Sequence, residues 1–253
     1  MRFRPCIDLH DGQVKQIVGA TLGADKAGLR TNFSSTLPPA YFATLYRRDG
    51  LTGGHVIMLG PGNEPAALDA LAAWPGGLQL GGGITDENAA RWLDHGASHV
   101  IVTSHVFRNG QLDRDRLRIL NRLVGRDRLV LDLSCRWRDD GYYVVTDRWQ
   151  RFTSLRISPE LLADLSAFCA EFLVHAVDVE GTCTGVDARL LGLLAESIPL
   201  PTTYAGGVAS VADLELIRAA GRGRIDVTVG SALDIFGGSG LRYRDLVSCC
   251  GPA

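Results

Sequence analysis

Two aspartates near the ends of similar apolar runs are the residues of this sequence best suited to acid–base chemistry. Asp8 lies in the run FRPCIDL at 3–9, and Asp132 lies in RLVLDL at 128–133. Either carboxylate alone would suit a structural role such as a cap. Two carboxylates that face one substrate can act as general acid and general base when their surroundings separate their pKa values. We therefore predict that Asp8 and Asp132 form a catalytic pair.

Paired glycines repeat along the chain with the same spacing as the aspartates. Gly82 and Gly83 follow one apolar run and Gly206 and Gly207 follow another, and the two pairs are as far apart as the two aspartates. Glycine lets backbone N–H groups approach a phosphate closely, and the start of a helix adds favourable partial charge. One such pair marks any tight turn, whereas two pairs at this spacing predict two phosphate-binding cups.

Small polar residues close two further apolar runs and extend these cups. The segments are VIVTS at 100–104 and VTVGS at 227–231. Thr103 would complete the first cup, and Gly230 and Ser231 would complete the second. The second cup leads into ALDIF at 232–236, which we predict to be a short helix of the kind that barrels add beside a phosphate. The duplication predicts a small-molecule bisphosphate, with an anionic group at each end, as the substrate.

Short β-branched runs alternate with helical patterns along the whole chain. This alternation is typical of an α/β protein, here a single (β/α)8 TIM barrel over 1–253, with a doubly wound open sheet as the alternative. The repeats predict two-fold pseudo-symmetry between half-barrels at about 1–125 and 126–253. The eight predicted strands are 3–9, 55–59, 78–80, 99–103, 128–133, 172–179, 202–205 and 226–230. The predicted helices are 38–48, 64–73, 86–95, 111–124, 158–170, 186–195 and 210–220.

A barrel of this kind places catalytic groups at the carboxyl ends of its strands, and the first and fifth strands face each other. Two long connections, 12–37 and 134–157, follow those two strands and are predicted to be active-site loops. Trp149 in the second loop could stack on a planar heterocycle or pack the loop onto the barrel. His175 could face the barrel interior and contact substrate, and Asp178 is a further candidate, as a supporting or loop-ordering carboxylate.

Composition excludes several classes of function. A net charge of −2, with 46% hydrophobic and 21% charged residues, is ordinary for a soluble enzyme and predicts neither a nucleic-acid nor a membrane partner. Apolar runs stay short of the roughly 20 residues that span a bilayer. The amino terminus leads straight into a strand and leaves no room for a targeting peptide, so we expect a cytoplasmic protein. We also expect a monomer.

The sequence predicts no metal and no cofactor. The six cysteines have neither C-x-x-C spacing nor zinc-like clustering, so we expect reduced thiols. His95 and His99 have helical spacing, but Gly96 between them indicates the end of a helix instead of a ligand pair. Nucleotide, dinucleotide and serine-nucleophile motifs are all missing from the sequence.

Five segments together resemble a known family: CIDLHDGQV (6–14), LQLGGGI (78–84), LVLDLS (129–134), YAGGV (204–208) and VTVGSALDIFGG (227–238). They are similar to the phosphoribosyl isomerases of histidine biosynthesis, and VTS, DLSCR, HAVDVEG and GSALDIFGG are closest to the eukaryotic-type branch. The resemblance implies an Amadori rearrangement of phosphoribosylformimino-aminoimidazole-carboxamide ribonucleotide, from aminoaldose to aminoketose, without metal or cofactor.

By match to the family motifs, Asp8 would move the C2′ proton and Asp132 would help to open the ribose ring, although the near symmetry leaves these roles interchangeable. Trp149 would cover the substrate. The phosphate-contacting positions would be Gly82, Gly83, Thr103, Gly206, Gly207, Gly230 and Ser231.

Two departures from the family pattern concern the surroundings of the aspartates. Val177-Asp178 stands where the common pattern ends its sixth strand with Thr-Asp, and Thr182 or Thr184 could compensate. Lys15 stands beside Gln16, so the usual basic residue after the first strand is displaced.

Three other functions stay open. The sister cyclase of the pathway shares the aspartates and the cups, but it usually has a Lys after D-G-x-V-V and D-A-K-R where this chain has DLSCR at 132–136. A phosphoribosyl-anthranilate isomerase would need only one cup. A catalytically silent sugar-phosphate-binding barrel would not need both Asp8 and Asp132.

Overall fold

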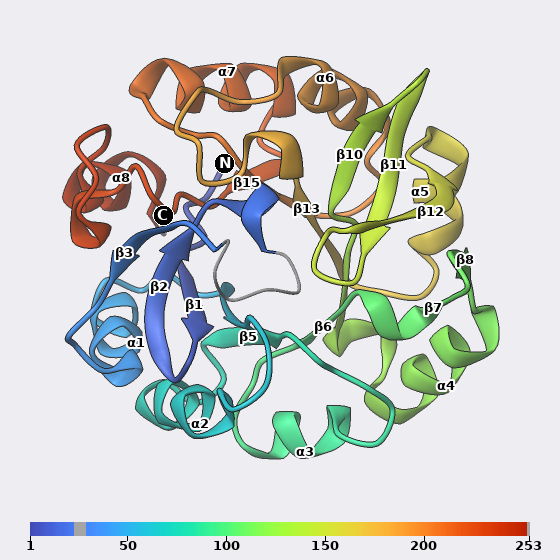
Figure 1. The fold of residues 1–253 in the computed structure, drawn as a ribbon, viewed down its shortest axis with the longest axis horizontal. Coiled ribbons are helices and arrows are strands. Elements are labelled where there is room, and N and C mark those ends of the chain that lie inside the picture. Colours follow the sequence, from blue (N-terminus) through green and yellow to red (C-terminus); the bar gives the residue numbers. More distant parts are fainter. Residues whose placement is uncertain (23–28, 252–253) are drawn as a thin grey trace.

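The computed structural model describes residues 1–22 and 29–251, and these residues form a (β/α)8 barrel (Figure 1). Every neighbouring pair of strands around the barrel is parallel. The predicted fold class is confirmed. The barrel strands in the described residues are β1 (Cys6–His10), β4 (Gly54–Met58), β5 (Leu78–Gly81), β6 (Val100–Val102), β9 (Leu129–Asp132), β13 (Glu171–His175), β14 (Thr202–Ala205) and β15 (Ile225–Val227).

The amino-terminal residues close the barrel against its last strand. Phe3 forms a parallel bridge with Val227 of β15. Arg4 N–H donates to the Val227 carbonyl at 2.8 Å, and Val227 N–H donates to the Arg2 carbonyl at 3.0 Å. Closure satisfies the backbone groups of both edge strands, so the open-sheet alternative is excluded.

Helices form an outer ring around these strands (Figure 1). Ser158 and Ser210 cap two of them, since their side chains accept hydrogen bonds from Leu161 and Asp213 N–H. A last helix not predicted from sequence packs Tyr243 edge-on against Phe3, with ring centroids 6.2 Å apart. The helices in the described residues are α1 (Pro39–Arg48), α2 (Glu64–Ala73), α3 (Ala89–Asp94), α4 (Arg114–Val124), α5 (Pro159–Leu165), α6 (Ala188–Ser197), α7 (Val211–Gly221) and α8 (Tyr243–Cys250).

Several predicted element boundaries were wrong. The sixth barrel strand stops at His175 and not at 179, because the chain turns into a 3-10 helix, η5 (Val177–Val179). The helix predicted over 86–95 begins only at Ala89, since Asn88 Oδ1 accepts from Thr85 N–H and holds the preceding residues in a turn. The helix predicted from 111 starts later because Gln111–Leu112 (β8) pairs with Phe107–Arg108 (β7) as a hairpin.

Both long connections contain antiparallel strands. In the first, β2 (Gln13–Ile17) and β3 (Thr31–Ser34) continue antiparallel from β1. Residues 23–28 of this connection lie outside the described residues. The second connection folds into β10 (Cys135–Arg138), β11 (Gly141–Thr146) and β12 (Arg151–Arg156), on another side of the barrel mouth (Figure 1). These small sheets lie at the mouth of the barrel (Figure 1).

Inward-facing residues of the strands form layers, because side chains alternate between the two faces of a strand. Ile101, Val130 and Leu173, with Ile57, make a small apolar cluster that is separate from the large core between strands and helices. Two residues further along β9 and β13, the same face carries Asp132 and His175. The apolar layer therefore supports the polar groups at the carboxyl ends.

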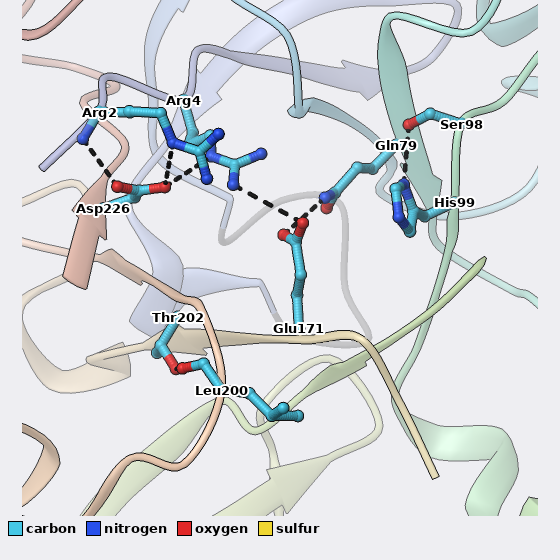
Figure 2. Close-up of polar contacts among 9 residues, drawn as sticks. All are labelled: Arg2, Arg4, Gln79, Ser98, His99, Glu171, Leu200, Thr202 and Asp226. Carbon is cyan, nitrogen blue, oxygen red and sulfur yellow. Dashed lines mark hydrogen bonds and ion pairs between the residues drawn. The ribbon is translucent and has the colours of Figure 1, made fainter. Parts of the chain in front are cut away.

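The opposite, amino end of the barrel is filled by paired charges (Figure 2). Arg4, which is 4% exposed, donates through Nε to Asp226 at 2.9 Å and lies 3.6 Å from Glu171. Gln79 donates to the other oxygen of Glu171 at 2.9 Å. Buried ions persist when each has a partner, so this cluster seals the end of the barrel away from the site.

No helix within residues 1–22 and 29–251 has both the length and the apolar character that a membrane span requires.

Asp226→Ala should destabilise the protein by about 3 kcal/mol, because removing one member of a buried pair leaves the Arg4 charge only partly compensated by Glu171. Urea unfolding measures this change. Asp127→Ala is the control, since Asp127 is 90% exposed in its pair with Arg126 and should cost below about 1 kcal/mol. Equal losses for the two variants would contradict a structural role for the cluster.

Candidate active site

The two predicted catalytic aspartates line the same cavity at the carboxyl ends of the barrel strands. Asp8 comes from β1 and Asp132 ends β9, which are the first and fifth strands of the ring. The cavity has a volume of about 350 Å³. The structure therefore brings together two carboxylates that are far apart in sequence, as predicted.

The glycine cups lie on two adjoining cavities in the described residues. The larger cavity is bordered by Gly82, Gly83 and Thr103. A smaller one, of about 30 Å³, is bordered by the other predicted cup, namely Gly206, Gly207, Gly230 and Ser231. Asp8, His175 and Glu180 line both cavities. The site thus has a cup at either end and titratable groups between them.

The cup turns require glycine. Gly82 has φ +91°, and a Cβ there would lie 2.2 Å from the Met58 carbonyl oxygen. Gly206 has φ +114°, and its Cβ would lie 2.7 Å from the Ala176 carbonyl oxygen. Both the backbone conformation and the close approach exclude a side chain, so the repeat of these glycines in the sequence has the same physical cause in both halves.

The hydroxyl groups of the cups have protein partners. Thr103 Oγ1 donates to Asp132 Oδ2 at 3.3 Å, which joins the first cup to this carboxyl group. Ser231 Oγ accepts from Asn32 Nδ2 on β3 at 2.9 Å, and Asn32 also donates to the Gly181 carbonyl. The first long connection therefore reaches the second cup, a contact that no sequence pattern indicated.

Asp8 has an environment that favours its protonated form. Burial and the nearby charge of Glu180 raise the pKa of Asp8 to about 7. Gln16 Nε2 donates to Asp8 Oδ2 at 3.2 Å and opposes this shift. A neutral amide from β2 therefore contacts Asp8, while the neighbouring Lys15 pairs with Asp11 at 3.4 Å. A carboxyl group with this pKa is suited to act as a base near neutral pH.

Asp132 has the opposite environment. Its Oδ1 accepts from Ser134 N–H at 2.8 Å and from Ser134 Oγ at 2.6 Å, and it lies 3.5 Å from His175 Nδ1. Burial alone would raise the pKa of Asp132, but the charge and hydrogen bond of His175 and the bonds from Ser134 outweigh burial and lower it. The two carboxyl groups therefore differ in protonation, as an acid–base pair requires.

His175, and not Val177, is the last residue of the sixth barrel strand beside Asp132. Val177 is buried in η5, beyond the strand. The hydroxyls of Thr182 and Thr184 lie on an exposed loop and bond to each other at 2.7 Å. The sequence interpretation that placed Val177-Asp178 at the strand end was wrong, because it made this strand four residues too long.

Asp178 orders the second long connection. It accepts from Arg136 Nε at 2.7 Å and from Trp137 N–H at 3.1 Å, both at the start of the three-stranded sheet. Its predicted loop-ordering role fits this position.

Trp149 lies in the turn between β11 and β12 and borders the larger cavity. Its ring centroid is 5.6 Å from that of His175. A Cβ added at Gly19 would lie 2.7 Å from the indole, so the ring also packs against the first connection. Both interpretations of Trp149, substrate contact and loop packing, are compatible with this placement.

Cys6, Asp8 and His55 are the residues in the described part of the chain that could jointly hold a metal, with ligand atoms within 4.8 Å of one another. Burial and the charges of Asp8 and Glu180 raise the pKa of Cys6 well above its usual range, which opposes a thiolate ligand. Gln16 Nε2 already donates to both Cys6 and Asp8. The residues present therefore fit a hydrogen-bonded cluster better than a metal centre.

Sequence reasoning did not assign Ser134, Glu180, Gln16 or Asn32 to the site. For Ser134 the signal was available, because it follows Asp132 within the run that carries the family resemblance. Asn32 and Glu180 reach the site through connections whose paths depend on tertiary structure, so spacing could not place them.

Fold and site define a (β/α)8-barrel enzyme whose carboxyl-end cavity holds two carboxyl groups between two glycine turns. A comparison with known proteins also identifies the family of this chain. The model of the family described as histidine biosynthesis protein matches residues 2–238, and the chain belongs to that family.

Three relatives have the same name, 1-(5-phosphoribosyl)-5-((5-phosphoribosylamino)methylideneamino) imidazole-4-carboxamide isomerase. The protein of Medicago truncatula, described as chloroplastic, is 55% identical over 98% of this chain and 81% of its own length. That of Neurospora crassa is 52% identical over 97% of both chains. The protein of Saccharomyces cerevisiae is 46% identical over 98% of this chain and 97% of its own length.

Gly206→Ala should reduce the rise in melting temperature that inorganic phosphate produces in the unchanged protein, because the added Cβ displaces the backbone of one of the two cups. Thermal melts with and without phosphate measure this. Gly223→Ala is the matched control, since Gly223 has φ +80° with open space around its Cβ position. It should lose about 1–2 kcal/mol of stability from backbone strain yet keep the phosphate effect. Full phosphate stabilisation of Gly206→Ala would contradict the assignment of this cup.

Proposed function

We propose that this protein catalyses the Amadori rearrangement of phosphoribosylformimino-aminoimidazole-carboxamide ribonucleotide in histidine biosynthesis. The reaction converts an aminoaldose into an aminoketose. The observation that supports it most strongly is the placement of two carboxyl groups of opposite protonation behaviour, Asp8 and Asp132, in one cavity between the two glycine cups. The names of the relatives and the family match agree with this activity.

The substrate in this proposal is a small bisphosphate that spans both cups. One phosphate would sit against Gly82, Gly83 and Thr103, and the other against the second cup at Gly206, Gly207, Gly230 and Ser231. The sugar that carries the reacting carbons would then lie between them, beside the groups shared by both cavities. Trp149 borders the larger cavity, where a planar imidazole could stack on it.

Each aspartate has a distinct task in this proposal. Asp8, whose pKa of about 7 leaves much of it ionised near neutral pH, takes the proton from C2′. Asp132 serves the ring-opening step, in which the ring oxygen of the ribose must receive a proton. The rearrangement moves protons within one molecule, so the residues of the chain can carry it through without an added redox group.

The sister cyclase is less well supported. Its pattern places a Lys where this chain has Gln16, and Gln16 contacts Asp8 directly at 3.2 Å. In this chain Asp8 therefore contacts a neutral amide, whereas the cyclase pattern would supply a Lys at that position.

The protein is further proposed to act in the cytoplasm as a monomer, without nucleic-acid or membrane partners. All six cysteines belong to the described residues and none is in a disulfide, which suits a reducing compartment. The net charge of −2 also gives nucleic acid and anionic membranes little attraction.

Asp8→Asn and Asp132→Asn should each lower kcat by at least about 10²-fold, because each removes one partner of the acid–base pair. The absorbance change on adding the formimino aminoaldose to purified protein follows the reaction. Asp127→Asn, an exposed carboxylate, should turn over like the unchanged protein. Unimpaired turnover by Asp8→Asn would refute the acid–base assignment.

The same assay separates the other functions. Binding of the aminoaldose without turnover by the unchanged protein would indicate a silent barrel. Formation of imidazole-glycerol phosphate with added ammonium would indicate the cyclase, and turnover of phosphoribosyl-anthranilate would reveal a second substrate.

Trp149→Ala should raise KM about tenfold through loss of stacking, with a smaller effect on kcat, and Trp149→Phe should restore most of the affinity. Steady-state kinetics measure both. Trp137→Ala serves as the control, because Trp137 is 39% exposed and packs on Tyr142 outside the cavity. An unchanged KM in Trp149→Ala would leave loop packing as the role of the ring.

A further inference from the structure

The hydrogen bonds around Asp132 raise the question of which group supplies the proton for ring opening. Asp132 Oδ1 accepts from the backbone N–H of Ser134, and Oδ2 lies 3.3 Å from Thr103 Oγ1, which donates to it. Ser134 Oγ donates to Oδ1 as well, at 2.6 Å. Donors directed at both oxygens stabilise the ionised carboxylate, and a carboxylate has no proton to give.

His175 lies next to that carboxylate and faces the cavities in which the substrate would bind. It follows the inward-facing Leu173 by two residues on β13, is 8% exposed and lines both cavities. Its Nδ1 is the nitrogen near Asp132, at 3.5 Å, and near Ser134 Oγ, at 3.3 Å. Nε2 is therefore the ring nitrogen that remains for a substrate between the cups.

Resting on the isomerase function proposed above, we propose that His175 is the general acid of the reaction and that Asp132 positions and charges its imidazole. The catalytic pair is then Asp8 and His175, with Asp132 acting through the histidine.

The charges that face His175 favour an imidazolium. Asp132 on β9, Glu180 after η5 and Asp8 on β1 all act on it, whereas His55 on β4 is neutral because burial lowers its pKa to about 3. Burial also disfavours charge on His175, but these carboxylates, Asp132 foremost, raise the pKa of His175 to about 9. At neutral pH the histidine therefore carries the proton that Asp132 lacks.

The proton balance of the reaction closes with these two groups. His175 gives its proton to the ring oxygen O4′ as the C1′–O4′ bond breaks, and the lone pair on the attached nitrogen forms a C1′=N iminium. Asp8 removes the C2′ proton to give the enaminol. Asp8 then returns a proton to C1′ while the 2′-hydroxyl proton goes back to His175, which leaves the aminoketose and both groups as they began.

The test is the pH profile of kcat/KM for the full chain acting on the formimino aminoaldose. The unchanged protein should show a bell-shaped profile, in which kcat/KM rises near pH 7 as Asp8 ionises and falls near pH 9 as His175 loses its proton. His175→Gln should lose about 10²–10⁴-fold in kcat and lose the alkaline fall, with KM little changed. His99→Gln, at the amino end of the barrel, is the control and should keep the full bell.

Asp132→Asn separates the two candidate acids. If His175 is the acid, the weak residual activity of Asp132→Asn keeps an alkaline fall, moved to lower pH because the carboxylate no longer supports the imidazolium. If Asp132 is the acid, that fall disappears in Asp132→Asn and persists in His175→Gln, which overturns the proposal.

Chemical rescue provides a readout that a structural role would not move. Added imidazoles should restore turnover to His175→Gly in proportion to their acidity, and a variant that is folded by circular dichroism but not rescued counts against His175 as acid. Turnover by the unchanged protein is measured first. If it is absent, the isomerase function fails; if it is present and His175→Gln matches it, only the role of His175 fails.

Discussion

The pairing of residues 2–4 with β15 is the constraint on which the site depends. The backbone bonds between Arg4 and Val227 close the ring of parallel strands, and Asp226 beside them pairs with the buried Arg4. Closure sets β1 across from β9, so two carboxyl groups that enter from opposite strands meet one cavity. An open sheet would leave them at distant points of one edge. The meeting of the two carboxyl groups thus depends on hydrogen bonds made at the far end of the barrel.

The two halves of the ring have equivalent glycine turns, but the titratable groups between these turns differ. The cups at Gly82 and Gly206 both require glycine because a carbonyl oxygen of the neighbouring strand end fills the space of a side chain. The groups between the cups differ: Asp8 is buried beside Glu180 and has a raised pKa, whereas Asp132 receives hydrogen bonds and a facing imidazole that lower its pKa. The predicted phosphate cups follow the repeat, whereas the proposed proton transfer depends on the asymmetry.

Most barrel strands and both cups could be predicted because they depend on local pattern: apolar runs, turn glycines and their repeat. Boundaries that depend on neighbours could not. The sixth strand was predicted through 179, yet the chain leaves the sheet after His175, and this error hid the residue that contacts Asp132. Helix α8 was missed for the same reason, since it packs Tyr243 against Phe3 at the other end of the chain. The three-stranded sheet of β10, β11 and β12 was predicted only as a long loop.

Residue types and spacing alone specified the alternation of strands and helices, the two aspartates and the two glycine turns, because each rests on steric rules that act over a few residues. Tertiary structure decided which carboxyl group has a raised pKa and which has a lowered one, since Glu180, Gln16 and Ser134 reach the aspartates from other parts of the fold. It also decided that His175 lies against Asp132. Protonation depends on distance and burial, and a linear sequence contains neither.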